Sequence, residues 1–393
     1  MTPLAITART ATTACGRGVG ALREAIAARR SGLRPNDFSA TPLATWIGRV
    51  EGLESLPLPA SLAPWECRNN RLAWLALQQD DMCARVQAVR ERYGAHRVAI
   101  VIGTSTSSIG ATEEAYTRLD AQLRFPADLN RPIVHTVHSL GDFLQAATGL
   151  RGPCVTLATA CSSSAKVFAQ AARLIQSGVV DAALVGGVDT LCGSVLFGFR
   201  SLGLISADPC RPFDVARNGL SLGEAGGFAL IERVGEGPWL LGYGESSDAH
   251  HMSSPHPEGL GARLAMRAAL QRAALASDAV DYINLHGTAT PKNDEIEAAA
   301  VAALFPATTS ASSTKAWTGH TLGAAGIVES VIALESIATG LVPGSLNCEQ
   351  PDPACGPQLQ RDNLQRDVRV VMNNSFGFGG NNCSLVFGVG RVA

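Results

Sequence analysis

Short runs of aliphatic and β-branched residues alternate along this chain with longer Ala-rich segments of helical periodicity. The runs at 98–103 (VAIVIG), 181–188 (DAALVGGV) and 227–232 (GFALIE) are apolar at nearly every position. Strands of this kind are buried on both faces, as in a sheet between layers of helices. The alternation predicts an α/β fold. Further strands are predicted at 154–159, 282–287, 368–374 and 383–388, and helices at 161–177, 260–276, 293–304 and 322–339.

The predicted helix 161–177 has the clearest periodicity. Its apolar residues recur at the i, i+3, i+4, i+7 spacing of one helix face. Gly178 follows as a natural stop. Because a predicted strand ends at 159, the chain must turn from strand to helix close to Cys161. The residues of the apolar face are Phe168, Ala171, Ala172 and Ile175.

A chain of 393 residues can build one large core or two fused halves. A break near 233–240 (RVGEGPWL) separates two strand-rich parts and predicts halves at 1–235 and 236–393. This division suggests an internal duplication, although no repeat is recognisable residue by residue. The Pro-rich stretch 342–367 predicts a surface connection.

Composition excludes several classes of partner. The 32 basic and 34 acidic residues leave a net charge of −2, so no nucleic acid or membrane surface is expected as a partner. No run of about 18 uncharged apolar residues predicts a membrane span, and the N-terminus lacks a signal-peptide pattern. Ten scattered cysteines without a CxxC pair predict a reducing, cytoplasmic setting and no metal site.

Cys161 lies in TACSSSAK (159–166), at the predicted strand-to-helix turn. A cysteine in the first turn of a helix lies near the positive end of the helix dipole, which favours the nucleophilic thiolate. The small serines after it leave room for an extended thioester arm. A buried structural thiol is an equally simple interpretation of the local sequence.

Two histidines follow far downstream, in LHGTAT (285–290) and TGHTLGAAG (318–326). His286 ends a predicted strand, where most histidines are structural. His320 lies in a small-residue segment that must pack its backbone tightly. Lys315 and Glu329 flank it and can form an ion pair that influences nearby protonation, although a purely structural ion pair has the same pattern.

The segment NNSFGFGGNNCS (373–384) is a Gly-rich turn between two predicted strands. It lacks the strand–GxGxxG–helix context of a dinucleotide site. The backbone N–H of Phe378 can instead form an oxyanion hole together with the N–H of Cys161.

Together these motifs resemble the β-ketoacyl-acyl carrier protein synthases of the elongating class I/II type, which are thiolase-like condensing enzymes. The resemblance extends over about 97–388, and its specificity comes from the joint order of the motifs. It implies a thiolase-like fold of two duplicated βαβαβαββ halves in five αβαβα layers. The motifs are TACSSS (159–164), LHGTATPKND (285–294), TKAWTGHTLGAAG (314–326) and NSFGFGGNN (374–382).

The resemblance also implies a role for each site residue. Cys161 becomes the acyl-accepting nucleophile, and His286 and His320 promote malonyl decarboxylation and stabilise the enolate. Lys315 is the active-site lysine with Glu329 as its partner. The remaining residues bind substrate: Thr288 and Thr290 hydrogen-bond the phosphopantetheine arm, Phe378 gates the acyl pocket, and the stretch 248–253, including Ser253, lines the tunnel of the arm.

The implied reaction is a ping-pong condensation that needs no metal and no dissociable cofactor, because the substrates are carried on the phosphopantetheine of acyl carrier protein. Carrier proteins are acidic, so a basic patch is expected, with Arg68, Arg71 and Arg211 as candidates. The resemblance implies a homodimer in which segment 132–148 reaches the neighbour's acyl pocket, and a heterodimer with a related subunit is the alternative.

Two segments depart from the family pattern. The first strand reads AITARTATTACG (5–16), where relatives carry a glycine-rich Thr-Gly-Leu-Gly. The loop GTSTSSIG (103–110) places Thr106 where an acyl-pocket residue is expected. Such polar residues favour a conjugated or otherwise modified chain, as in polyene pigment pathways, over a long saturated one.

Four other readings fit less well. A thiolase needs a second catalytic cysteine in a Cys-x-Gly setting, whereas Cys383 is followed by Ser384 and Leu385. An initiating class III synthase uses Cys-His-Asn. A chain-length-factor partner usually lacks the nucleophile that Cys161 supplies. The S-x-x-K matches SSAK (163–166) and SSTK (312–315) lack the other elements of a serine acyl-enzyme.

Overall fold

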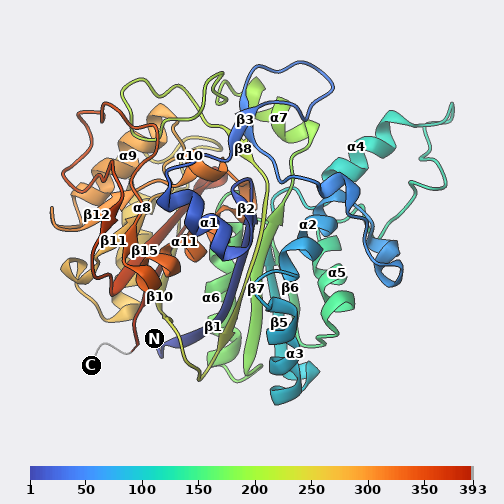
Figure 1. The fold of residues 1–393 in the computed structure, drawn as a ribbon, viewed down its shortest axis with the longest axis horizontal. Coiled ribbons are helices and arrows are strands. Elements are labelled where there is room, and N and C mark those ends of the chain that lie inside the picture. The colour runs from blue at the N-terminus through green and yellow to red at the C-terminus, as the bar shows by residue number, and fades with distance from the viewer. Residues whose placement is uncertain (391–393) are drawn as a thin grey trace.

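The computed structural model describes residues 1–390, and an 11-stranded sheet runs through the molecule with helices on both sides (Figure 1). Its strands are β1 (Leu4–Thr13), β2 (Gly16–Arg17), β5 (Val98–Gly103), β6 (Cys154–Leu157), β7 (Ala182–Asp189), β9 (Ala225–Glu232), β10 (Trp239–Ser247), β11 (Tyr282–Asn284), β12 (Ser310–Ser312), β15 (Val370–Gly377) and β16 (Asn381–Gly388). Two small sheets contain β3 (Leu33–Pro35), β4 (Trp46–Gly48) and β8 (Leu222–Gly223), and β13 (Leu341–Val342) and β14 (Leu364–Gln365). The helices are α1 (Gly18–Ala27), α2 (Arg68–Leu77), α3 (Met82–Tyr93), α4 (Ile109–Thr117), α5 (Ser139–Thr148), α6 (Ser163–Gln176), α7 (Gly193–Ser201), α8 (Leu260–Ala273), α9 (Pro291–Ala302), α10 (Lys315–Thr318) and α11 (Ala325–Thr339).

The sheet consists of two halves with the same strand order. One half runs β1-β9-β7-β5-β6 and the other β10-β16-β15-β11-β12. In each half the first two pairings are antiparallel and the last two are parallel. The halves join where β1 pairs with β10, at Leu4↔Leu240 and Ala5↔Trp239. The duplication that the sequence only suggested is therefore present in the topology.

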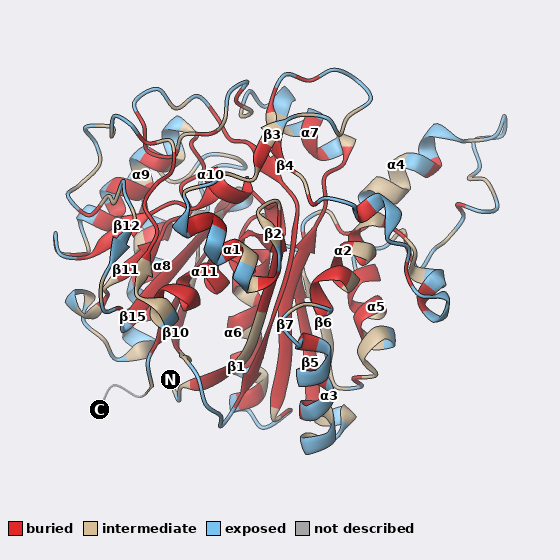
Figure 2. Cartoon of the chain, viewed as in Figure 1, coloured by how far each residue is buried: buried red, intermediate tan, exposed pale blue. Residues whose placement is uncertain are grey.

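Two helices lie between the halves of the sheet. Helices α6 and α11 contact each other and strands of both halves, whereas α2, α3 and α5 cover one outer face and α8 and α9 the other (Figure 1). These layers follow the order αβαβα, so the predicted thiolase-like fold is confirmed. All four apolar positions predicted for α6 are fully buried. Helix α11 is buried along most of its length, whereas α6 exposes Arg173 and Gln176 (Figure 2).

The buried helix α11 is apolar because it is a core element. Within residues 1–390, Leu322–Thr339 is the one stretch long and apolar enough to cross a membrane, and 83% of it is buried inside the protein. Such burial is typical of the central helix of a folded domain.

The sequence prediction missed β10 and most N-terminal helices. Strand β10 carries Gly242 and Gly244, which lower strand propensity but let α8 approach closely: a Cβ added at Gly244 would lie 1.8 Å from the carbonyl oxygen of Ala265. Helix α6 begins at Ser163, two residues later than predicted. Long-range packing, which has no local sequence signal, decides these features.

Candidate active site

Cys161 lies on a sharp turn between β6 and α6. Ala160 adopts a left-handed backbone conformation with φ of 52°. The hydroxyl of Ser163 accepts from the Thr159 N–H at 2.9 Å and donates to the carbonyl of Ala160 at 2.6 Å. These contacts satisfy the backbone of a turn that L-residues seldom adopt. The turn directs the Cys161 side chain, which is 5% exposed, into the interior of the molecule.

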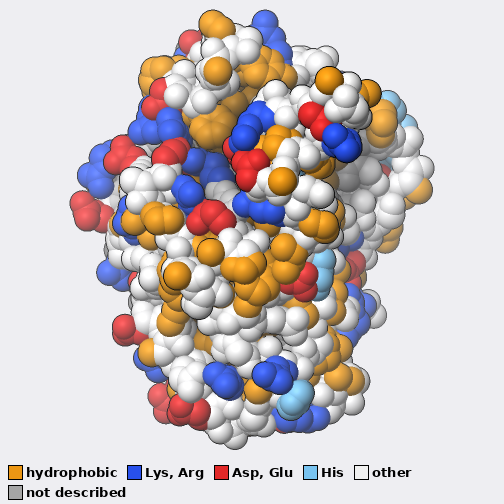
Figure 3. Space-filling view, turned by 90° about the vertical axis from the view of Figure 1, so that its right-hand side faces the viewer, with side chains coloured by type: hydrophobic (Ala, Val, Ile, Leu, Met, Phe, Trp, Pro, Cys, Tyr) orange, Lys and Arg blue, Asp and Glu red, His pale blue; other side chains and the backbone are white. Residues whose placement is uncertain are grey.

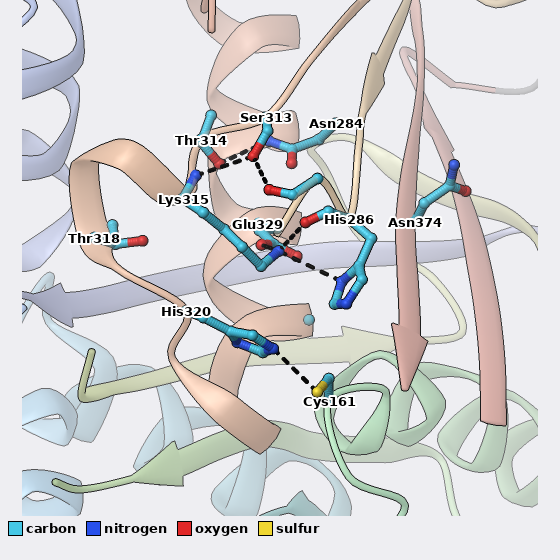
Figure 4. Close-up of polar contacts among 12 residues, drawn as sticks. Cys161, Asn284, His286, Ser313, Thr314, Lys315, Thr318, His320, Glu329 and Asn374 are labelled. Carbon is cyan, nitrogen blue, oxygen red and sulfur yellow. Dashed lines mark hydrogen bonds and ion pairs between the residues drawn. The ribbon is translucent and has the colours of Figure 1, made fainter. Parts of the chain in front are cut away.

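His320 is fixed at both its backbone and its ring. Its N–H donates to the carbonyl of Ser221 at 2.7 Å, and its carbonyl accepts from the N–H of Gly223 at 3.0 Å. The Leu322 N–H donates to His320 Nδ1 at 3.1 Å. Because Nδ1 accepts, the ring proton is on Nε2. This Nε2 lies 3.0 Å from the sulfur of Cys161 (Figure 4).

His286 approaches the same sulfur from the end of β11. Its backbone N–H and that of Gly287 each donate to the buried carboxylate of Glu297 at 2.8 Å. The two imidazole rings lie 5.5 Å apart between centroids. The sulfur of Cys161 and a ring nitrogen from each histidine all lie within 4.8 Å of one another.

Lys315 forms a buried ion pair with Glu329 and also contacts His286 (Figure 4). Its ammonium lies 3.4 Å from His286 Nδ1 and also donates to the carbonyl of His286 and to Glu329. A donor at Nδ1 leaves the proton of His286 on Nε2, as in His320. The structure therefore directs two Nε2–H groups toward one region.

Both imidazoles are neutral near pH 7. Burial, followed by the nearby charge of Lys315, holds the pKa of His286 and that of His320 well below the ordinary value for histidine. Burial also raises the pKa of Glu329 to about 7, against the opposing effect of Lys315. Near pH 7 Glu329 is therefore only partly ionised, and the positive charge of Lys315 lies behind two uncharged hydrogen-bond donors.

The thiolate predicted for the resting Cys161 is wrong. Burial raises the pKa of Cys161 to about 11, and the charge of Lys315 and the backbone N–H groups of Phe378 and Cys161 only partly oppose it. The positive end of the helix dipole lies two residues beyond Cys161, because α6 begins at Ser163. The resting group is a thiol, and the surrounding donors stabilise the anion once its proton leaves.

Replacing Lys315 with methionine is expected to slow alkylation of Cys161. Removal of the positive charge raises the pKa of the thiol further, and each pKa unit lowers the thiolate fraction about tenfold. We therefore expect the iodoacetamide rate at pH 8 to fall roughly tenfold for Lys315→Met. Lys166→Met is the control, because the Lys166 ammonium lies on Asn381 at 3.3 Å. An unchanged alkylation rate in Lys315→Met would show that this charge does not act on the sulfur.

A cavity of about 250 Å³ opens at these groups. The rings of Phe378 and Phe199 stack beside it, with centroids 5.5 Å apart and planes inclined by 20°. Sulfur and imidazoles lie at its base, and hydroxyl and aromatic groups form its walls. The lining includes Cys161, Phe199, Asp248, Ser253, His286, Thr288, Thr290, Lys292, His320, Phe376 and Phe378.

Comparison with known proteins assigns the chain to a family. Residues 71–236 match the family described as beta-ketoacyl synthase, N-terminal domain, and residues 239–349 match beta-ketoacyl synthase, C-terminal domain. The chain belongs to the β-ketoacyl synthase family. It is a condensing acyltransferase of the elongating type, and enzymes of this family need no metal or cofactor beyond carrier-bound phosphopantetheine.

Individual relatives cover most of this β-ketoacyl synthase. The 3-oxoacyl-[acyl-carrier-protein] synthase 2 of Coxiella burnetii is 30% identical, with 94% of both chains covered. That of Vibrio cholerae is 35% identical over 75% of this chain and 76% of the relative. A chain from the complex of a ketosynthase with its chain length factor, from Xenorhabdus doucetiae, has a TM-score of 0.89 at 35% identity, covering 99% of this chain and 98% of that one.

The structure brings most predicted site residues of the synthase together. Ser253, Thr288, Thr290 and Phe378 line the same cavity as Cys161 and the histidines. Thr106 does not line this cavity, and its hydroxyl donates to the buried carboxylate of Asp189 at 2.7 Å. It is therefore a structural hydrogen-bond donor here, in contrast to the predicted wall of the acyl pocket.

The three arginines predicted for carrier docking are also placed differently. Within residues 1–390, none of them lines the cavity that contains Cys161. Arg68 and Arg71 line a second cavity of about 450 Å³. Arg68 forms ion pairs with Glu224 and Glu54, and Arg71 with Glu66, at 2.5–2.6 Å. Arg211 lines neither cavity.

Phe199 and Lys292 are among the cavity residues that sequence reasoning missed. Phe199 lies on α7, and nothing in the local sequence LFGFR (196–200) distinguishes it from a core residue. Lys292 was within reach, because it lies inside the quoted motif LHGTATPKND (285–294). Its side chain is 74% exposed at the mouth of the cavity, where it pairs with Glu295.

Proposed function

We propose that this synthase condenses malonyl-acyl carrier protein with an acyl chain held on Cys161. The observation that supports this most strongly is the meeting of one sulfur with two neutral Nε2–H imidazoles at the base of a single cavity. Such donors, fixed before the reaction begins, stabilise developing negative charge without reorganisation.

In the first half-reaction the acyl chain moves from its carrier thioester to Cys161. The sulfur attacks the thioester carbonyl, and the backbone N–H groups of Phe378 and Cys161 receive the negative charge of the tetrahedral intermediate. The carbon–sulfur bond to phosphopantetheine then breaks. The proton of the Cys161 thiol is transferred to the leaving thiolate, so that the carrier departs as a free thiol.

In the second half-reaction malonyl-carrier protein occupies the cavity and loses carbon dioxide. The electrons of the broken carbon–carbon bond form an enolate, whose oxygen accepts from the Nε2–H groups of His286 and His320. The enolate carbon attacks the acyl-cysteine carbonyl. Collapse of that intermediate releases the β-ketoacyl carrier and the Cys161 thiolate, which takes a proton from solvent.

Other cavity residues bind the substrate in this proposal. The hydroxyls of Thr288 and Thr290 lie 2.8 Å from each other and offer donors to the amides of the phosphopantetheine arm. Phe378 acts as the gate to the acyl pocket, with Phe199 as its stacking partner. Lys292 at the mouth supplies positive charge for an acidic carrier protein, whereas Arg68 and Arg71 are already paired with Glu224, Glu54 and Glu66.

The pathway is proposed from the likeness to the Xenorhabdus ketosynthase complex. That structure contains a chain length factor, and other relatives are synthases of acyl carrier protein substrates. We place this synthase in fatty acid or polyketide biosynthesis in the cytoplasm. The preference for a modified, polyene-type chain rests only on the polar sequence of the loop 103–110, since Thr106 does not line the cavity of Cys161. Extension rates on saturated and polyenoyl carrier thioesters test that preference.

A non-catalytic chain-length-factor role is the alternative. The purified chain alone, supplied with acyl- and malonyl-carrier proteins, is expected to form β-ketoacyl carrier. Formation of product only after addition of a second, related subunit that carries its own reactive cysteine would favour the alternative. Cys161 argues for the catalytic role, since a scaffold needs no nucleophile.

The synthase is proposed to work as a dimer, either with itself or with a related subunit. Helix α4 and residues 118–138 form an arm that projects from the body (Figure 1). Tyr116, Leu123 and Val137 of the arm are 63%, 79% and 53% exposed. The strand β6 ends the sheet nearby with a half-buried edge. Figure 3 looks onto this face, where hydrophobic side chains are frequent and the surface is hollowed.

Placing a charge on the arm is expected to weaken this dimer. Val137→Glu puts a carboxylate into the proposed interface, where burial of an unpaired charge costs at least about 3 kcal/mol, or more than a hundredfold in dissociation constant. Light scattering over a concentration series measures the change. Val234→Glu is the matched control, because Val234 is 65% exposed and lies in the segment that links the two halves along the sequence, outside the arm. Equal dissociation constants for the two variants would exclude the arm from the interface.

A further inference from the structure

The carboxylate of Asp189 collects hydrogen bonds from two segments that lie far apart in the sequence. Asp189 ends β7 and is fully buried. Its Oδ1 accepts from the hydroxyls of Thr104 at 2.5 Å and Thr106 at 2.7 Å. Its Oδ2 accepts from the backbone N–H groups of Ser105 at 2.8 Å and Gly323 at 2.6 Å. A buried carboxylate is stable only when donors surround it in this way.

Gly323 belongs to the turn that orients the ring of His320. Leu322 has a left-handed backbone with φ of 58°, which costs a non-glycine residue conformational energy. In this conformation the Leu322 N–H points at His320 Nδ1, at 3.1 Å. The next N–H along the chain, that of Gly323, points at Asp189 instead. The strained residue is therefore held between the imidazole and the carboxylate.

The contact between Gly323 and Asp189 leaves no room for a side chain. A Cβ added at Gly323 would lie 2.6 Å from Asp189 Oδ2 and 2.6 Å from the backbone nitrogen of Ser105. Gly323 itself has a negative φ, so an alanine is acceptable to its own backbone. Glycine is needed at this position because any side chain would separate the Asp189 carboxylate from the turn.

We propose that Asp189 is a positioning residue for His320. Its carboxylate holds the turn at Leu322 and Gly323, so that the Leu322 N–H stays on Nδ1 and the ring keeps its proton on Nε2, facing Cys161. Without that contact the turn relaxes, Nδ1 loses its donor, and the ring populates the other tautomer and other orientations. The inference rests on the proposed role of His320 as a hydrogen-bond donor to the enolate.

Two variants disturb the contact from opposite sides. Asp189→Ala removes the acceptor, and Gly323→Ala forces the turn away while the carboxylate remains. For both we expect kcat of condensation to fall about tenfold to a hundredfold, with KM for malonyl-carrier protein within about threefold, since ångström-scale misplacement of a catalytic group has effects of this size. Gly323→Ala keeps the test possible if Asp189→Ala does not fold.

Nitrogen NMR of histidine-labelled protein, without substrate, separates positioning from a purely structural role. The wild type is expected to give His320 as the Nε2–H tautomer, whereas both variants give a mixture. Thr104→Val is the control, because it removes a bond to Oδ1 of the same carboxylate but leaves Gly323 in contact; its His320 tautomer and kcat are expected to match the wild type.

The proposal would be overturned if Asp189→Ala and Gly323→Ala fold but leave the His320 tautomer and kcat unchanged. It would also be overturned if kcat falls in Thr104→Val as much as in those two variants. The tautomer does not depend on any reaction. A shifted tautomer with no condensation by the wild type would therefore refute the proposed function alone.

Discussion

Replacing Cys161 with alanine is expected to lower condensation by at least about a thousandfold, because the variant has no atom that can hold the acyl chain. Acyl transfer, followed as a mass increase of the intact protein, should be absent. Decarboxylation of malonyl-carrier protein should persist, since both imidazoles and the Lys315–Glu329 pair remain in place. This separation of two activities is specific to a nucleophile that acts beside an independent decarboxylation site.

Cys210→Ala is the matched control for that variant. Cys210 is as buried as Cys161, being 1% exposed, and its sulfur lies 3.6 Å from the carbonyl oxygen of Lys315. Its pKa is also raised by burial to about 11. We expect the Cys210→Ala variant to be acylated on Cys161 at the wild-type rate. Acylation of Cys161→Ala itself would mean that another residue is the nucleophile.

Replacing either His286 or His320 with alanine is expected to produce the second large loss. Removal of one fixed hydrogen-bond donor to a developing oxyanion lowers kcat by about a hundredfold to a thousandfold. Malonyl decarboxylation and condensation should fall together, because both pass through the same enolate. Acylation of Cys161 should continue, since the N–H groups of Phe378 and Cys161 that stabilise its tetrahedral intermediate are unchanged.

The pH dependence of the wild type gives an independent check of the same claim. Both histidines act as neutral donors, and the pKa of each lies well below 6.5. The histidines therefore add no titration as the pH falls through 6.5. Any change there should come from Glu329, whose pKa is about 7, and should be absent from Glu329→Gln, whereas an imidazole with an ordinary pKa would titrate in both proteins. His96→Ala is the control for the two histidine variants, because His96 is exposed and its loss should leave the decarboxylation rate unchanged. A decarboxylation rate that survives in both active-site variants would remove the histidines from the mechanism.

Much of the site could be predicted because its chemistry lies in short motifs. Cys161, His286 and Phe378 each come soon after a strand, and parallel strands bring their ends to one edge of a sheet. His320 follows the short helix α10 and was found from its small-residue motif. The fold class followed from strands such as β5 and β7, whose unbroken apolar sequence matches burial at every position.

Properties that depend on the folded surroundings could not be predicted in this way. The protonation of Cys161 is an example: the helix start argued for a thiolate, but burial by distant segments has the larger effect. Asp189 carries no local signal, because its partners Thr104 and Gly323 come from loops that only the fold brings together. Arg68 resembles a free surface cation in the sequence, whereas the buried carboxylate of Glu224 binds it.

The most direct test of the account is a single-turnover experiment on the isolated acyl-enzyme. The synthase is first loaded from an acyl-carrier thioester, freed of excess carrier, and then mixed with malonyl-carrier protein. We predict that the mass of the protein returns to that of the free enzyme as one β-ketoacyl carrier forms for each acyl group lost from Cys161. Product formation while the acyl group remains on Cys161, or loss of that group without formation of a β-ketoacyl carrier, would contradict the account.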